Sequence, residues 1–239
     1  SNVKINLNMK GRLHLPLVDA AEGGYLDVVS FLIKQKNVDI QQETTRKISP
    51  LFAAIINDHL NVVKFLIQNG AAEKLDNNKI GFCFLTAFEN ENIEMIRYLD
   101  KVLKIPYFDK YQLIINRQID PTIRILEQTT FGDVFMQVAC NNENEEMIDF
   151  LLNKKCTLDS INPNIIIRNK SFDFLNVLID KGLSVANKDP INSLTPIITM
   201  VNFGSYSDVV NLISKGASLN REIIQKYQLI QSVSGRGDV

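Results

Sequence analysis

Histidine and cysteine are the first residues to consider, because a nucleophilic or metal-dependent site would draw on them. The chain has two histidines and three widely spaced cysteines: His14, His59, Cys83, Cys140 and Cys156. A cysteine nucleophile would have to meet one of the histidines, and a zinc site favours a Cys-x-x-Cys spacing that this sequence lacks. We therefore expect no catalytic residue, no bound metal and no cofactor.

Three further segments could carry chemistry, and each has a simpler explanation. The acidic run 143–146 resembles a metal or acid–base site, but negative charge before a helix also stabilises the N-terminal end of its dipole. Glu22-Gly23-Gly24 is too short for a phosphate-binding loop and is typical of a helix end. Arg236-Gly237-Asp238 matches the integrin-recognition tripeptide, which is a weak signal in a chain that begins without an apolar signal segment.

Composition narrows the classes of partner. The 239 residues carry a net charge of −1, and the sequence pI is about 6.2, so there is no basic field for nucleic acid or an anionic membrane. No stretch has the roughly 18 apolar residues that a membrane helix needs. An odd number of cysteines argues against a disulfide framework and favours a reducing compartment. We expect a cytoplasmic protein that does not bind nucleic acid and does not insert into a membrane.

The elements that position these residues are set by an internal repeat. Residues 15–21 (LPLVDAA) and 49–55 (SPLFAAI) form one phrase, and residues 25–33 (YLDVVSFLI) and 59–67 (HLNVVKFLI) form a second. Pro16 and Pro50 are 34 positions apart, as are Val28 and Val62. The second phrase returns near Met95, Met147 and Val209. Recurrence at such a period indicates a repeat architecture.

These phrases resemble the ankyrin repeat family. The first is similar to the Thr-Pro-Leu-His-x-Ala-Ala opening of that family's first helix. The second is similar to its Gly-His-x-x-Val-Val-x-x-Leu-Leu run. The Gly-Ala ending of that run survives at Gly70 and Gly216, and its glycine alone survives at Gly182. The resemblance implies an all-α fold: an ankyrin-like α-solenoid of stacked helix-turn-helix repeats with short β-turn fingers. It also implies that His59 bonds the backbone of a neighbouring repeat and that His14 lies on a finger.

Local physics is consistent with stacked helix pairs. Val28, Val29, Leu32 and Ile33 form one apolar stripe on a short helix, which only a neighbouring repeat can cover. Glycine at the end of the second helix suits a left-handed residue, and proline at the start of the first lacks only an N–H that would be unpaired there. The prolines expected at that place are Pro16, Pro50 and Pro196.

The repeat spacing predicts one array over residues 1–239 with irregular units. Between Met95 and Met147 lie 52 positions, too many for one repeat and too few for two. The last unit stops before its second helix, so we expect a fragment of a longer protein. The expected units are 11–43, 44–76, 77–104, 105–130 (short), 131–160, 161–187 (short), 188–220 and 221–239 (incomplete).

The resemblance also implies a binding surface, on the concave side that the fingers and first helices share. Its apolar anchors would be Ile48, Ile56, Phe131 and Phe203, with a core position as the alternative for Phe131. The full set of expected contact residues is Thr45, Arg46, Ile48, Ile56, Asn57, Asn78, Lys79, Glu89, Asn90, Phe131, Asp133, Asn141, Asn142, Asn192, Asn202 and Phe203.

The expected function is protein–protein recognition by a monomeric, non-catalytic array. The partner would be another protein, and the array could serve as the recognition module of a bacterial effector or viral host-range protein. A different alternative is the targeting domain of a larger enzyme whose catalytic part lies outside this chain. A third is a self-assembling structural array that stacks through its ends.

Overall fold

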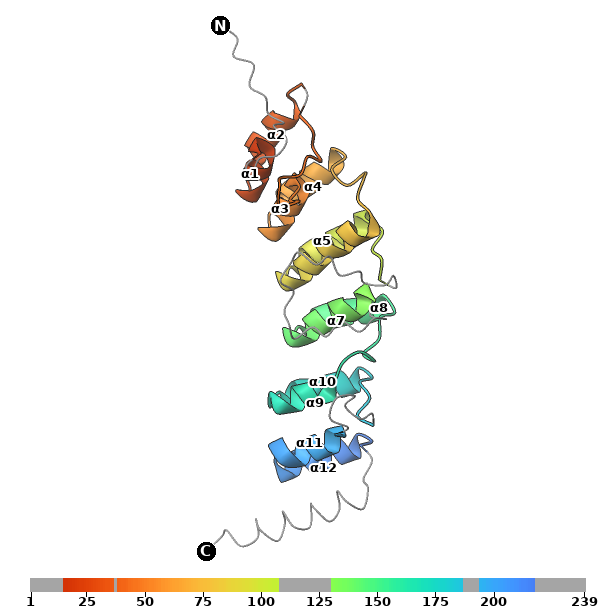
Figure 1. The fold of residues 1–239 in the computed structure, drawn as a ribbon. Coiled ribbons are helices and arrows are strands. Elements are labelled where there is room, and N and C mark those ends of the chain that lie inside the picture. Colours follow the sequence, from red (N-terminus) through yellow and green to blue (C-terminus); the bar gives the residue numbers. More distant parts are fainter. Residues whose placement is uncertain (1–14, 37, 108–129, 187–193, 218–239) are drawn as a thin grey trace, which may run out of the picture. The chain divides into compact units, whose positions relative to one another are not determined.

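The computed structural model describes residues 15–36, 38–107, 130–186 and 194–217. Within these ranges the chain forms short helices that follow one another in pairs (Figure 1). The helices fall into two compact units, α1–α8 and α9–α12. Their bounds are α1 Pro16–Glu22, α2 Leu26–Ile33, α3 Pro50–Ile56, α4 Leu60–Gln68, α5 Asn77–Glu89, α6 Ile93–Val102, α7 Phe131–Asn141, α8 Glu145–Asn153, α9 Pro163–Arg168, α10 Phe172–Asp180, α11 Pro196–Phe203 and α12 Tyr206–Ser214.

The first helices of successive pairs pack on one another in each unit. In the first unit α1 contacts α3, α3 contacts α5 and α5 contacts α7, while α2 contacts α4. In the second unit α9 contacts α11, and each of these helices also packs on its own partner, α10 or α12. The apolar stripes are only partly buried between pairs: Val29 and Leu32 on α2 are under 10% exposed and Ile33 is half-buried. Val28 was expected in the same covered stripe but is 41% exposed. The stacking of successive pairs is the all-α solenoid arrangement that the repeat predicted.

Proline and glycine mark the helix ends as the sequence indicated. Pro16, Pro50 and Pro196 are each the first residue of their helix. Gly70, Gly182 and Gly216 have φ values of 90°, 106° and 98°, in the left-handed region that favours glycine. These expectations are confirmed.

One left-handed residue also turns the chain between the two helices of five pairs. In the first pair this residue is Gly24, where a Cβ would lie 2.7 Å from the ring of His59. The loops of the other four pairs use non-glycine residues at φ of 51° to 63°. Glycine is therefore required at this first loop by the close approach of the next repeat. The five residues are Gly24, Asp58, Glu91, Glu143 and Lys170.

An aromatic core joins α5 to α7. The rings of Phe88 and Phe135 stack with centroids 5.3 Å apart, and the ring of Phe84 lies 5.1 Å from that of Phe135. Tyr107 adds an edge-on contact with Phe84 and donates its hydroxyl to Asp100 at 2.6 Å. Such ring pairs stabilise a core beyond their burial alone.

The helix pairs 77–102 and 131–153 are therefore neighbours in the stack. The short unit predicted at 105–130 lies largely outside the described residues. The Asp100 carboxylate accepts a hydrogen bond from the Tyr107 hydroxyl and forms an ion pair with Lys154. The Glu91 carboxylate accepts a hydrogen bond from the Asn144 amide. The spacing of 52 positions between Met95 and Met147 thus separates two pairs that touch directly.

Candidate protein-binding surface

A tight hairpin at residues 44–48 forms a finger between α2 and α3. The backbone N–H of Thr44 donates to the carbonyl of Ile48 (3.0 Å), and the N–H of Lys47 donates to the carbonyl of Thr44 (2.9 Å). Lys47 takes the left-handed conformation (φ 61°), as is common in three-residue hairpin loops. Thr44 is buried, and its hydroxyl oxygen accepts a further hydrogen bond from the N–H of Ile48. The exposed side chains of Thr45 and Arg46 therefore project from a backbone that is fixed at its base.

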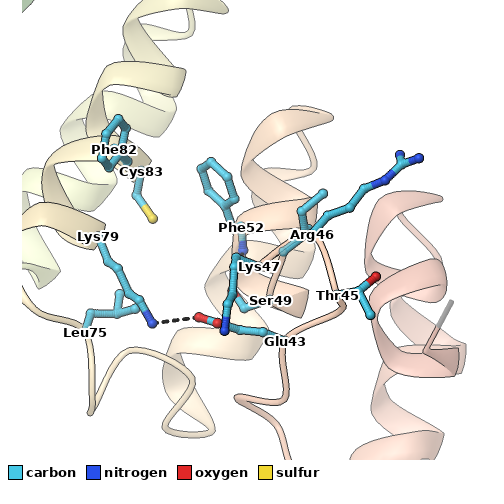
Figure 2. A pocket seen from close by; sticks show the side chains of 11 residues that line it. Glu43, Thr45, Arg46, Lys47, Ser49, Phe52, Leu75, Lys79, Phe82 and Cys83 are labelled. Carbon is cyan, nitrogen blue, oxygen red and sulfur yellow. Dashed lines mark hydrogen bonds and ion pairs between the residues drawn. The ribbon is translucent and has the colours of Figure 1, made fainter. Parts of the chain in front are cut away.

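A pocket of about 660 Å³ opens beside this hairpin. We call it the finger groove. Its walls come from the finger, α3, the turn before α5 and the first half of α5, all within the first unit (Figure 2). The lining consists of Glu43, residues 45–49, Phe52, Leu75, Lys79, Phe82 and Cys83.

Apolar side chains form one part of the finger groove. Phe52 on α3 and Phe82 on α5 are both half-buried, so each keeps part of its ring open to a ligand (Figure 2). Leu75 is also half-buried, whereas Cys83 is 3% exposed. Half-buried rings in a depression are typical of the anchor positions of protein interfaces.

Charged side chains form the other part. Lys79 Nζ lies 2.6 Å from Glu43 Oε1, and this bond raises the pKa of Lys79 because Glu43 stabilises the charged ammonium. The side chains of Arg46 and Lys47 are exposed and form no ion pair with any residue that the structure describes. The finger groove therefore combines an apolar wall with an excess of positive charge.

Comparison with known proteins identifies the architecture. Residues 10–105 match the family model for ankyrin repeats, in three copies. The chain therefore carries ankyrin repeats over residues 10–105. The ankyrin repeat domain of Bcl-3 has a TM-score of 0.60, at 19% identity, over 91% of this chain and 99% of that one. Ankyrin repeats are generally protein–protein interaction modules, and the fold is typically a non-catalytic scaffold.

Relatives of known sequence are longer than this chain. Alpha-latrocrustotoxin-Lt1a of Latrodectus tredecimguttatus is 44% identical over 64 residues, which are 27% of this chain and 4% of the toxin. A putative ankyrin repeat protein of Rickettsia felis is 24% identical over 86% of this chain and 52% of its own length. The chain thus spans about half or less of these relatives.

Four of the residues predicted to bind a partner come together in the finger groove. Thr45, Arg46 and Ile48 belong to the finger, and Lys79 lies across from them on α5. Asn78 is next to Lys79 in the first turn of α5, not in a loop, because this helix begins at Asn77 with Asp76 as its N-cap. Whether these residues bind a partner stays a prediction.

Sequence reasoning missed the apolar part of the groove. Phe52 and Phe82 do not occupy equivalent places in their helices, since Phe52 is the third residue of α3 and Phe82 is the sixth residue of α5. They line the same groove because α5 has 13 residues where α3 has 7, and the second turn of α5 carries Phe82 beside the finger. The only signal in the sequence was the placement of both rings near the start of a first helix.

A second group of predicted residues lies at the C-terminal ends of α3 and α5. Asn57 donates its amide to the carbonyl of Ala53 at 2.9 Å. Asn90 donates its amide to the carbonyls of Ile55 (3.0 Å) and Ile56 (3.2 Å), which ties α5 to α3. Glu89 is exposed, as are both asparagines, and Ile56 is half-buried. These asparagines thus have a structural role, and their exposure leaves them available to a partner.

Phe131 is not a surface residue. Its ring is fully buried beside Phe135, above Gly81, where a Cβ would come within 2.1 Å of it. The alternative of a core position is therefore correct, because α7 packs directly on α5. Asp133 forms a capping box with Thr130, accepting from its N–H at 2.8 Å.

The remaining predicted residues lie at the ends of α7 and α11. Asn141 is exposed and accepts from the amide of Gln137, and Asn142 is the half-buried C-cap of α7. Asn202 is exposed, and Phe203 is 44% exposed on α11. Asn192 lies outside the described residues.

Among the residues first considered for chemistry, His59, Cys140 and Cys156 occupy structural positions. His59 Nε2 lies 2.9 Å from the carbonyl of Glu22, which confirms the expected bond to a neighbouring repeat. Burial raises the pKa of the Cys140 thiol to about 12 and that of Cys156 to about 11, so both are poor nucleophiles. His14 lies outside the described residues.

Across the described ranges, no group of three or more His, Cys, Asp or Glu side chains is placed to hold a metal ion. None of the helices that the structure describes is long and apolar enough to span a membrane.

Proposed function

We propose that this chain recognises a partner protein through the finger groove and the neighbouring exposed positions of α3 and α5. The observation that supports this most directly is the groove itself, which places two half-buried phenylalanine rings beside exposed cations. Aromatic residues and arginine are the side chains enriched in the energetic centres of interfaces. An interface of about 800 Å² per partner would cover the groove and the helix ends around it.

We further propose that the chain is a monomeric array that works in the cytoplasm as the recognition part of a longer protein. The similarity to a Rickettsia felis ankyrin repeat protein of roughly twice the matched length supports this. A bacterial effector or viral host-range protein is one such longer protein. A larger enzyme that uses this array for targeting is the alternative, and the sequence of the complete reading frame distinguishes the two.

The test compares partners captured by three forms of the chain. Arg46→Glu with Ile56→Asp changes the proposed surface, and Lys36→Glu with Val28→Asp makes the same kinds of change at exposed positions outside it. Each form is immobilised, and captured proteins are quantified by mass spectrometry. We expect the first double variant to lose partners that the second retains. Identical partner sets from wild type and the first variant would disprove the proposed surface.

A further inference from the structure

The finger groove has the size of a site for one large side chain and its flanking backbone. Its volume of about 660 Å³ lies within the range of pockets that bind small molecules and peptide anchors. Phe52 and Phe82 enter it from two successive first helices, and Leu75 completes the apolar wall (Figure 2). An apolar side chain placed between these residues would remove both rings from water.

Positively charged side chains outnumber negatively charged ones around the finger groove. Four charged side chains line it: Glu43, Arg46, Lys47 and Lys79. Glu43 and Lys79 form an ion pair with each other, which leaves Arg46 and Lys47 without a described counter-charge. Both stand on a finger whose base is fixed by three hydrogen bonds from and to Thr44. A partner that covers the groove therefore desolvates two cations whose backbone is held in a defined place.

A covered cation destabilises a complex unless the partner supplies an opposite charge. A carboxylate meets this need, and the planar guanidinium of Arg46 can bind one through two parallel hydrogen bonds. The preference is local, because the other end of α5 carries the exposed Glu89, ten residues or about 15 Å from Lys79 along the helix axis. Acidic residues are thus favoured at the finger end of the groove only.

We infer that the segment which enters the finger groove is a peptide segment of the partner with a large apolar side chain and nearby aspartate or glutamate residues. This inference rests on the proposed function and adds the chemistry of the partner. The apolar side chain occupies the space between Phe52 and Phe82. The carboxylates pair with Arg46 and Lys47.

The experiment selects binders from a phage-displayed library of random, unphosphorylated 12-residue peptides on the intact chain. We expect the selected peptides to be enriched in Asp or Glu within a few positions of Phe, Leu, Ile or Trp. Their affinity, measured by fluorescence anisotropy on synthetic copies, should fall as salt rises from about 50 to about 500 mM, since the Debye length shortens.

Variants locate the site. Arg46→Glu with Lys47→Glu should raise the Kd of an acidic peptide about tenfold or more, and Phe82→Ala should do the same through the lost anchor contact. Lys34→Glu with Lys36→Glu changes the net charge equally at exposed residues outside the groove and should raise the Kd by less than about threefold. Circular dichroism and the Tm of each variant confirm that it is folded.

The outcomes separate this inference from the proposed function. Selected peptides that lose affinity in Phe82→Ala but are neutral or basic overturn the acidic chemistry and leave the groove as the binding surface. Peptides that bind all groove variants like wild type overturn both. Failure of the library to yield any enriched acidic peptide also overturns the inference.

Discussion

At Gly81, on α5, the chain makes room for the ring of Phe131. A Cβ at this position would lie 2.1 Å from a ring atom, and Phe131 is fully buried, so the ring has no free space to enter. Gly81→Ala should therefore lower the free energy of unfolding by about 1–3 kcal/mol, although alanine favours a helix. Denaturant unfolding followed by circular dichroism measures this. In a Phe131→Leu background the penalty should shrink, and an equal penalty there would contradict the steric explanation.

The buried thiols predict how stability depends on pH. Burial raises the pKa of Cys140 to about 12 and that of Cys156 to about 11, both above the ordinary value of 9.0. The folded state therefore favours the protonated thiols. Their contribution to the free energy of unfolding is fully present below about pH 9 and is lost as pH rises towards 11. Each thiol contributes a slope of up to about 1.4 kcal/mol per pH unit in that window.

Unfolding in urea at several pH values tests this prediction. A Cys140→Ala, Cys156→Ala variant should lose less stability than wild type between about pH 9 and pH 11. Parallel losses in the two proteins would show that the thiols do not contribute. Tyr107 remains in both, and burial together with its bond to Asp100 raises its pKa as well, so part of the slope should persist.

At the scale of the element, helix α6 is held both by its own cap and by the preceding helix pair. Asn92 caps α6 by accepting from the N–H of Met95 at 2.8 Å, and its amide donates to Asp58 Oδ1 at 2.7 Å. Asn92→Asp keeps the cap, because aspartate caps as well as asparagine, but brings two carboxylates together. We expect a loss of about 1 kcal/mol in the free energy of unfolding.

Adding Asp58→Asn to the Asn92→Asp variant should restore most of that loss. The exchange returns an amide donor opposite a carboxylate, and asparagine tolerates the left-handed φ of 63° at position 58. Thermal unfolding at low and high salt is the measurement. A double variant as unstable as Asn92→Asp alone would mean that the bond between pairs contributes little.

A buried polar pair joins α9 to α11 in the second unit. The Thr199 hydroxyl donates to Asn164 Oδ1 at 2.5 Å, and the Asn164 amide donates to the carbonyl of Leu194; both side chains are 0% exposed. Thr199→Val preserves the shape but leaves the Asn164 oxygen without its donor, so it should cost about 1–3 kcal/mol. Thr199→Ser keeps the hydroxyl and is the matched control in urea unfolding. It should lose less than valine does, and a larger loss would contradict the hydrogen-bond explanation.

At the scale of the whole molecule, stability should be divided between the two compact units. In a repeat protein each pair interacts only with its neighbours, so local opening need not involve the entire chain. Gly81→Ala should reduce amide protection from hydrogen exchange in α1–α8, and Thr199→Val should reduce it in α9–α12. Mass spectrometry of peptides from both units measures this. If either variant weakened protection in both units equally, the chain would be one cooperative array.

The sequence by itself determined the features that depend on neighbouring residues. The helix pairs follow from a local repeat, as do the prolines at first positions such as Pro50 and the left-handed glycines such as Gly70. The bond from His59 to the preceding pair was implied by the resemblance to ankyrin repeats. Local patterns are readable because capping, chain turns and apolar periodicity act within a few residues.

Only the tertiary structure decided which pairs are neighbours. It places α7 directly on α5, which buries Phe131, although the spacing between these helices suggested a unit between them. It also brings Phe52 and Phe82 into one groove, because the longer α5 extends to the finger. Both results depend on helix length and stacking across more than 30 residues, which no local pattern of the chain encodes.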